Sequence, residues 1–197
     1  MKRGKLFICG MDIATSCGCA DGSPDDRRPR AFTWDLREAG KDRPARLAML
    51  MDYCDRYFRE NQVDALFYEK GLPIAALFAS VAKGGAQAAF RMGATDETIG
   101  FLRGAIGVVE ACAHRARVPR IEGVGVQQAR HALLGYSPKR GEGKDEVSER
   151  CRILGWAHKN QDESDALAIW SMGVGLMSPL SNYKSTPLFG AAGKDLI

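Results

Sequence analysis

The sequence has no apolar run of about eighteen residues or more, which is the length that a membrane-spanning helix needs. Residues 1–5 (MKRGK) resemble the basic end of a signal peptide. The apolar stretch behind them is short and is interrupted by Asp12, so a secretory signal is not predicted. We therefore expect an intracellular protein, in the cytoplasm of a bacterial cell or of a phage-infected host.

Cys-x-x-Cys pairs are also absent, although the chain has six cysteines. Structural zinc sites commonly use such pairs, so the spacing does not predict a zinc site. Cys17 and Cys19 lie two residues apart, which places both side chains on one face of a strand. We expect the cysteines to be reduced thiols, as is usual inside the cell.

The composition that is present is that of an ordinary globular domain. Of the 197 residues, 45% are hydrophobic and 26% are charged, which is enough apolar material for one core. The positive charge is concentrated, because residues 113–160 hold ten Lys or Arg against five Asp or Glu in a chain of net charge +4. Such a segment suits a polyanionic partner and is equally compatible with a solvated surface.

Hydrophobic periodicity predicts strands and helices in alternation. The predicted strands are residues 5–13, 15–22, 30–36, 63–68 and 120–126. The predicted helices are residues 44–61, most of 74–117, 127–134, 145–156 and 163–177, with a basic loop at 139–144. Three strands followed by alternating helices and strands indicate an α/β fold whose mixed sheet is antiparallel at one edge and parallel elsewhere. We expect one domain over residues 1–177 and a weakly ordered tail over residues 178–197.

Four acidic residues stand at the ends of these elements. Asp12 ends the first strand, and Glu69 follows the fourth. Asp162 and Asp165 are three residues apart at the start of the last helix, so they share one of its faces. Sites in open α/β sheets form at the carboxyl ends of strands, so the four acids are predicted to converge there. Taken singly, each acid is compatible with a turn or cap role, and Asp162 with an N-cap.

Converging carboxylates repel one another, and a divalent cation relieves that repulsion. Oxygen ligands without thiols or imidazoles suit Mg²⁺, with Mn²⁺ as a substitute. Two such ions about 4 Å apart can activate a water and stabilise the leaving oxygen of a phosphodiester. The acids therefore predict metal-assisted hydrolysis of a nucleic acid.

Three motifs resemble those of the RuvC-type Holliday-junction resolvases. An Asp ends the first strand in residues 10–12 (GMD), where the family has Gly-Ile-Asp. A Glu follows an apolar fourth strand in residues 66–69 (LFYE). The most specific motif is residues 162–168 (DESDALA), where two acids three apart precede an Asp-Ala-Leu-Ala helix. Their order and spacing agree with the family, and the resemblance extends over residues 5–177.

The resemblance implies an RNase H-like fold, a homodimer, and a metal-dependent endonuclease that nicks four-way DNA junctions. It implies that the four acids hold the metal and that Lys144 is catalytic. The segment after the fifth strand carries basic residues near the scissile phosphate in the family. The corresponding phosphate contacts here are Arg130, Lys139, Arg140 and Lys144.

The sequence also departs from the family. Residues 13–14 are Ile-Ala where the family has Pro-Gly, and residues 70–96 are longer than usual. Two other functions therefore stay open, an RNase H-like nuclease acting on flaps, forks or RNA–DNA hybrids, and a junction-binding protein with an idle site. Actin-like phosphotransferases are disfavoured, because they need glycine-rich phosphate loops and about twice this length.

Overall fold

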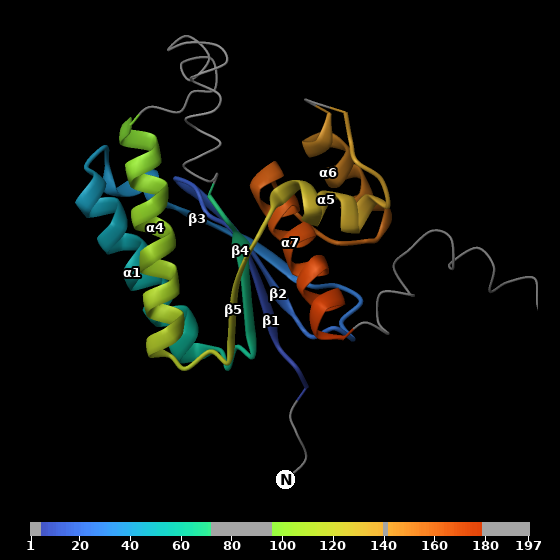
Figure 1. Ribbon diagram of the computed structural model, residues 1–197, viewed down its shortest axis with the longest axis horizontal. Helices are drawn as coiled ribbons and strands as arrows, with labels where there is room; N and C mark the ends of the chain where they lie inside the picture. The colour runs from blue at the N-terminus through green and yellow to red at the C-terminus, as the bar shows by residue number, and fades with distance from the viewer. Residues whose placement is uncertain (1–4, 72–95, 140–141, 179–197) are drawn as a thin grey trace, which may run out of the picture.

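A five-stranded mixed sheet forms the centre of the fold (Figure 1). The computed structural model describes residues 5–71, 96–139 and 142–178. The strand order is β3-β2-β1-β4-β5, with β1, β2 and β3 antiparallel and with β4 and β5 parallel to β1. This confirms the predicted mixed sheet. The strands are β1 (Ile8–Asp12), β2 (Ser16–Gly22), β3 (Arg30–Asp35), β4 (Ala65–Glu69) and β5 (Arg120–Val124).

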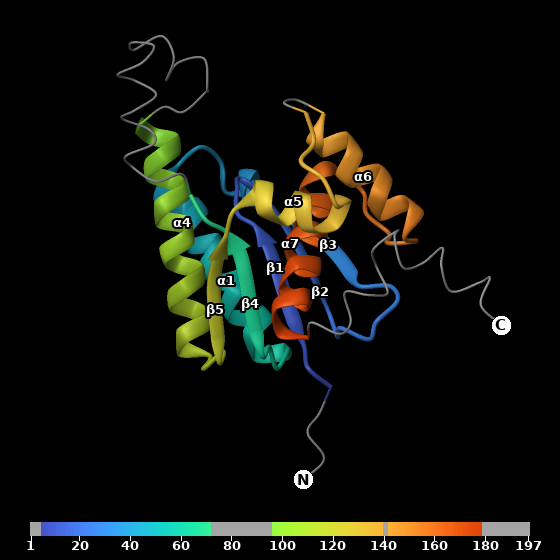
Figure 2. The same cartoon turned by 45° about the vertical axis from the view of Figure 1, so that its right-hand side comes forward.

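Helices cover both faces of the sheet, as two views of the ribbon show (Figures 1 and 2). Two long helices, α1 and α4, pack against each other on one face, and α5, α6 and α7 pack together on the other. A short 3-10 helix, η1, connects β3 to α1. The helices are η1 (Leu36–Ala39), α1 (Arg43–Glu60), α4 (Asp96–Arg115), α5 (Val126–Leu134), α6 (Gly143–Ile153) and α7 (Gln161–Met177).

Alternation along the central strands assigns their side chains to two separate cores. Cys9 and Met11 of β1 and Leu66 of β4 pack toward α1 and α4. Ile8 of β1 and Phe67 of β4 pack toward α5, α6 and α7. Because Asp12 and Glu69 follow in the same alternation, they point to the second face, where α7 lies.

The boundaries of the described helices and strands agree with the prediction to within a few residues, and the difference that matters for the site lies at the basic loop. The helix predicted from Asp145 begins two residues earlier, at Gly143, so Lys144 lies in the first turn of α6 and not in a loop. The N-cap position, Glu142, makes no side-chain capping bond, so the sequence carries no start signal there. The predictions for residues 74–95 and for the tail beyond Ser178 lie outside the described residues.

The six cysteines are buried free thiols, as expected. Cys17 and Cys19 share the core beside α1 and α4, which confirms that they lie on one strand face. Burial raises the pKa of the Cys151 thiol to about 12, so this sulfur stays protonated and unreactive. Within the three described ranges, no helix has the length and apolar character needed to cross a membrane.

Candidate active site

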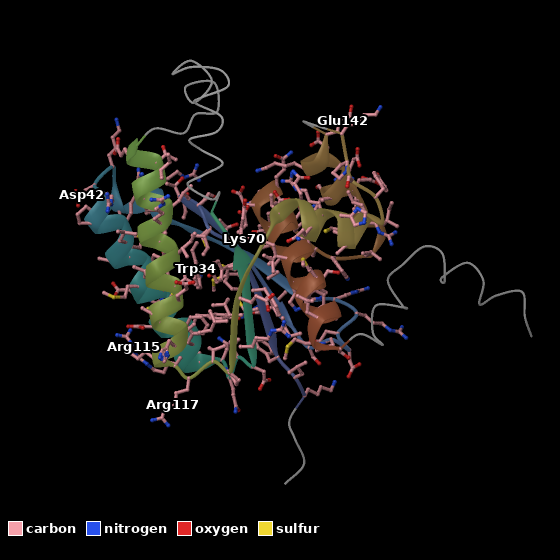
Figure 3. All side chains as sticks on the ribbon, viewed as in Figure 1. Trp34, Asp42, Lys70, Arg115, Arg117 and Glu142 are labelled. Carbon is pink, nitrogen blue, oxygen red and sulfur yellow. The ribbon has the colours of Figure 1, made fainter. Side chains whose placement is uncertain are left out.

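The ends of β1 and β4 place two carboxylates side by side. The strands run parallel with Met11 opposite Tyr68, so Asp12 and Glu69 are the next residues in register. Both side chains point toward α7, because each lies two residues after a position that packs against that helix (Gly10 and Phe67). Lys70, the residue after Glu69, lies between the two helical layers in the view of Figure 3.

The first turns of α7 bring the other two acids to the same place. Asn160 caps the helix by accepting a hydrogen bond from the backbone N–H of Glu163, at 2.8 Å. The predicted N-cap role of Asp162 is therefore taken by Asn160. Asp162 and Asp165 lie one turn apart on the face directed at the strand ends.

All four acids line one pocket of about 380 Å³ together with three basic side chains. Arg103 comes from α4, Arg130 from α5 and Lys144 from α6, so six separate elements contribute charged groups. The pocket also has an apolar side, formed in part by Ile99, Leu102 and Ile106 of α4. The convergence of acids predicted from the sequence is thus observed, and the apolar side was not predicted.

Arg130 forms a bidentate ion pair with Asp165. Its Nε and Nη2 atoms donate to the two carboxylate oxygens at 3.0 Å and 2.8 Å. Only 12% of the Arg130 side chain and 2% of the Asp165 side chain are exposed. A paired guanidinium is the usual way to bury a carboxylate at low cost, and the planar fork fixes its orientation. Arg130, predicted as a phosphate contact, is thus engaged with an acid in this structure.

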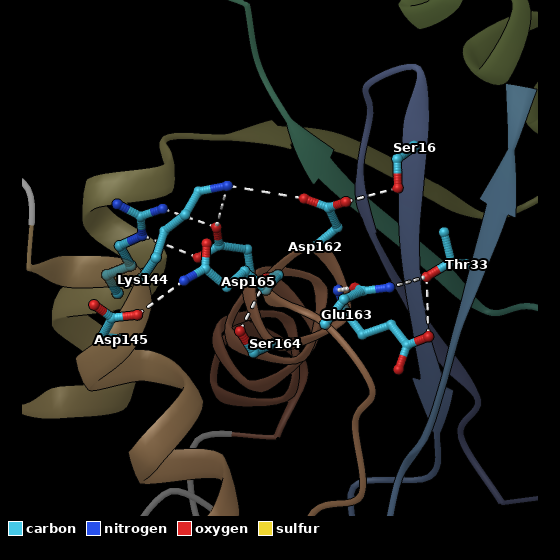
Figure 4. Close-up of polar contacts among 11 residues, drawn as sticks. Ser16, Thr33, Lys144, Asp145, Asp162, Glu163, Ser164 and Asp165 are labelled. Atoms are coloured by element: carbon cyan, nitrogen blue, oxygen red, sulfur yellow. Dashed lines mark hydrogen bonds and ion pairs between the residues drawn. The ribbon is translucent and has the colours of Figure 1, made fainter. Parts of the chain in front are cut away.

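Lys144 lies between the two acids of α7 (Figure 4). Its Nζ atom is 3.8 Å from an oxygen of Asp162 and 3.8 Å from an oxygen of Asp165. These distances are ion pairs without hydrogen bonds, and 45% of the lysine side chain is exposed. Lys144 is therefore a half-exposed charge that contacts both acids through ion pairs alone.

Asp162 has a second partner on the sheet. The hydroxyl of Ser16 donates a 2.7 Å hydrogen bond to the Asp162 carboxylate (Figure 4). Ser16 is the first residue of β2, on the hairpin that follows Asp12. This bond ties the Asp162 carboxylate to the hairpin that contains residues 13–14, and no pattern in the sequence predicts it.

Glu163 is a buried residue that the sequence pattern did not single out. Only 2% of it is exposed, and it accepts hydrogen bonds from the Thr33 hydroxyl at 2.9 Å and from the backbone N–H of Lys159 at 2.6 Å. Thr33 belongs to β3, so Glu163 ties the start of α7 to the far strand of the sheet. Its role is to hold the segment that carries Asp162.

The pKa of the Asp12 carboxyl is strongly raised. Burial, followed by the neighbouring carboxylates of Glu69 and Asp165, raises its pKa to about 9. A nearby cation would favour the ionised form and remove this penalty. A buried carboxyl surrounded by other carboxyls is a typical feature of functional sites.

The donor set fits a hard divalent ion. Carboxylate oxygens without thiolate or imidazole suit Mg²⁺ or Mn²⁺. Among the residues that the structure describes, no three acidic, His or Cys side chains already surround one point as metal ligands. The ion pairs explain this, because Arg130 holds Asp165 and Lys144 lies between Asp162 and Asp165.

The remaining predicted basic residues lie outside the pocket or outside the residues that the structure describes. Lys139 is exposed on the segment between α5 and α6, and it does not line the pocket. Arg140 lies outside the described residues. His158 contacts the Ser148 hydroxyl and the backbone carbonyl of Trp156, and it does not line the pocket.

Comparison with known proteins gives matches in structure only. No family model matches the sequence, and no curated protein matches it. Thermus thermophilus RuvC is 18% identical with a TM-score of 0.61, over 88% of this chain and 97% of that chain. The same enzyme in complex with a Holliday junction substrate is 16% identical with a TM-score of 0.59, over 87% of this chain and 95% of that chain.

A third structural match is a yeast protein. The yeast mitochondrial Holliday junction resolvase Ydc2 is 10% identical with a TM-score of 0.52, over 88% of this chain and 82% of that chain. At such identities the likeness concerns the fold, and it agrees with the mixed sheet and the helices on both its faces. The chain has the RNase H-like fold of the RuvC-type Holliday-junction resolvases.

Proposed function

We propose that this chain is a divalent-metal-dependent endonuclease that nicks four-way DNA junctions. The observation that carries the proposal is the convergence of Asp12, Glu69, Asp162 and Asp165 on one pocket, beside Lys144. The fold adds support, since one similar structure is of a RuvC in complex with a Holliday junction substrate. The basic segment after β5 supplies positive charge next to this pocket, as DNA binding requires.

The four acids would hold Mg²⁺, which supplies an activated water and charge neutralisation at the phosphate. Asp12 and Glu69 stand on the rigid sheet, so their separation is fixed by strand register. Ser16 and the buried Glu163 hold the start of α7 and with it Asp162. In this arrangement Lys144 is placed to donate to a phosphate oxygen once it leaves the carboxylates.

A labelled mobile four-way junction tests the proposal. Purified protein with Mg²⁺ is expected to give paired nicks at symmetric positions, and none when the metal is chelated. Cleavage of flaps or RNA–DNA hybrids with the junction spared would keep the active site and change the substrate. Tight junction binding without cleavage in Mg²⁺ or Mn²⁺ would contradict the proposed activity and indicate a junction-binding protein.

Lys144→Ala is expected to lower the cleavage rate about 100-fold, because a single positioned charge on a phosphate contributes that much. The slope of binding against salt should decrease by about one, since one phosphate contact is lost. Single-turnover cleavage and salt titrations of junction binding measure the two effects separately.

Lys139→Ala is the matched control for this prediction. Lys139 precedes the same helix but does not line the pocket. Its loss should weaken junction binding and leave the single-turnover rate of the bound junction unchanged. An equal fall in rate for both variants would show that Lys144 only binds DNA.

We also propose that the protein is a homodimer, because two active sites related by a two-fold axis suit a two-fold symmetric junction. Helix α4 is expected to supply much of the interface. Light scattering on the purified protein should give twice the mass of the chain. A monomer that makes paired symmetric nicks in one binding event would exclude this assembly.

A further inference from the structure

The charges in the pocket do not balance two divalent ions. Ionised, the four carboxylates carry four negative charges, and Arg103, Arg130 and Lys144 carry three positive ones. One negative charge remains, and a single divalent ion more than neutralises it. A second ion would leave an excess of positive charge in a largely buried site, which is costly unless another anion enters.

The two basic residues that form ion pairs with the acids are held very differently. Arg130 is 12% exposed and makes two hydrogen bonds to Asp165, whereas Lys144 is 45% exposed and makes only ion pairs at 3.8 Å. A lysine on a flexible stem can leave with little cost, but a buried bidentate pair breaks at high cost. Arg130 is therefore the fixed cation of the pocket.

The surroundings of Arg130 are shaped to keep its guanidinium in place. Its helix, α5, packs against α7 through buried Ala129 and Leu133. A Cβ atom at Gly143 would lie 3.1 Å from the Nη1 atom of Arg130, so the glycine at the start of α6 makes room for the guanidinium. Both oxygens of Asp165 face this group, and 2% exposure leaves that carboxylate little other access.

We propose that Arg130 takes the place of a second metal ion on Asp165, so that the site binds one divalent ion. This inference rests on the proposed function and narrows it. Asp165 then supplies charge through Arg130, and the ligands come from Asp12, Glu69 and Asp162. Arg130 is a positioning residue, because it acts through Asp165 and not on the reacting phosphate.

Counting bound Mn²⁺ tests this without any cleavage. Electron paramagnetic resonance of free Mn²⁺ is recorded while the full-length protein, without DNA, is titrated at pH 8. Wild type is expected to bind one ion. Arg130→Gln should bind two, because it exposes a full carboxylate on Asp165 and removes one positive charge.

Two further variants control for the change in side chain. Arg130→Gln with Asp165→Asn removes both partners and should return the count to one. Arg103→Gln removes an arginine that lines the same pocket, and no ion pair to the four acids is found for it among the described residues. That variant should also bind one ion, and thermal unfolding checks that each variant is folded.

The outcomes separate this inference from the proposed function. Two ions on the wild-type protein would overturn the role of Arg130, whether or not its variants fold, and would leave the nuclease proposal standing. One ion on a folded Arg130→Gln variant would also overturn it. A wild-type protein that binds no Mn²⁺ at all would contradict both the proposed metal-dependent nuclease activity and this inference.

Discussion

Asp12→Asn is expected to abolish junction cleavage and, in the same protein, to stabilise the metal-free fold. The loss of cleavage should reach about 1,000-fold or more, because the variant removes a charged ligand from the centre of the acid cluster. The gain in stability follows from burial, since Asp12 is 8% exposed and faces Glu69 and Asp165. A buried ionisable residue that destabilises the fold is typical of a functional site.

The gain in stability should depend on pH in a defined direction. The folded-state pKa of Asp12 is about 9 against an ordinary pKa of 3.8, so the folded protein holds a proton that the unfolded chain releases. The folded state loses stability by keeping Asp12 protonated. This loss is absent below the unfolded pKa and grows as the pH rises toward 9. The advantage of Asp12→Asn should therefore be small near pH 4 and on the order of a few kcal/mol at pH 8.

Urea unfolding in EDTA at several pH values measures this effect. Asp21→Asn is the matched control, because Asp21 is also buried but accepts hydrogen bonds from Arg30 and from the Tyr57 hydroxyl. Removing its charge should cost about 1–3 kcal/mol, since charge-assisted hydrogen bonds are weakened. An Asp12→Asn variant less stable than wild type at pH 8 would contradict the electrostatic account of the site.

Much of this site could be predicted from the sequence because its signals are local. Apolar runs that end in an acid predict a strand with a carboxylate at its carboxyl end, and this gave Asp12 and Glu69. Spacing of three on a helix gave Asp162 and Asp165. Since a parallel sheet aligns the ends of its strands, the meeting of these acids followed from fold class alone.

The rest depended on packing between distant elements, which periodicity does not describe. The pairing of Arg130 with Asp165 requires the angle at which α5 crosses α7, and basic character alone suggested a phosphate contact instead. The burial of Glu163 depends on Thr33 of β3, some 130 residues earlier in the chain. In a one-dimensional pattern, a first-turn glutamate reads as solvent-exposed.

The glycines under α7 are a further example, because no periodic pattern predicts that the helix backbone lies directly against them. An added Cβ at Gly18 would lie 2.1 Å from the backbone carbonyl oxygen of Asp162, which is far inside van der Waals contact. Gly18 is also the β2 partner of Asp12 in the antiparallel register. The absence of a side chain at this position therefore sets how closely the start of α7 approaches the end of β1.

Gly18→Ala is expected to reduce cleavage at least about 100-fold, because it displaces Asp162 relative to Asp12 and a shift near 1 Å costs that much. It should also destabilise the fold by about 1–3 kcal/mol, as overpacking does. Single-turnover cleavage over a range of Mg²⁺ concentrations, beside urea unfolding, measures both quantities. Cleavage should become weaker and need more metal.

Two other glycines separate misplacement of the acid from simple loss of stability. Gly173→Ala would bring a Cβ within 2.4 Å of the Phe67 ring, at the far end of α7 from the acids. It should destabilise the fold by a similar amount while keeping the metal dependence of the folded enzyme. Gly107→Ala has no atom within 4 Å and should stabilise α4 by about 1 kcal/mol.

The comparison of Gly18→Ala with Gly173→Ala decides whether the spacing between α7 and the sheet is a catalytic requirement. Both overpack the same helix against the same sheet, so their costs in folding should be alike. Only the first moves the backbone that carries Asp162. If both variants lose cleavage to the same extent at saturating Mg²⁺, activity depends on the stability of the fold as a whole, and the close approach at Gly18 has no separate role in placing the acid.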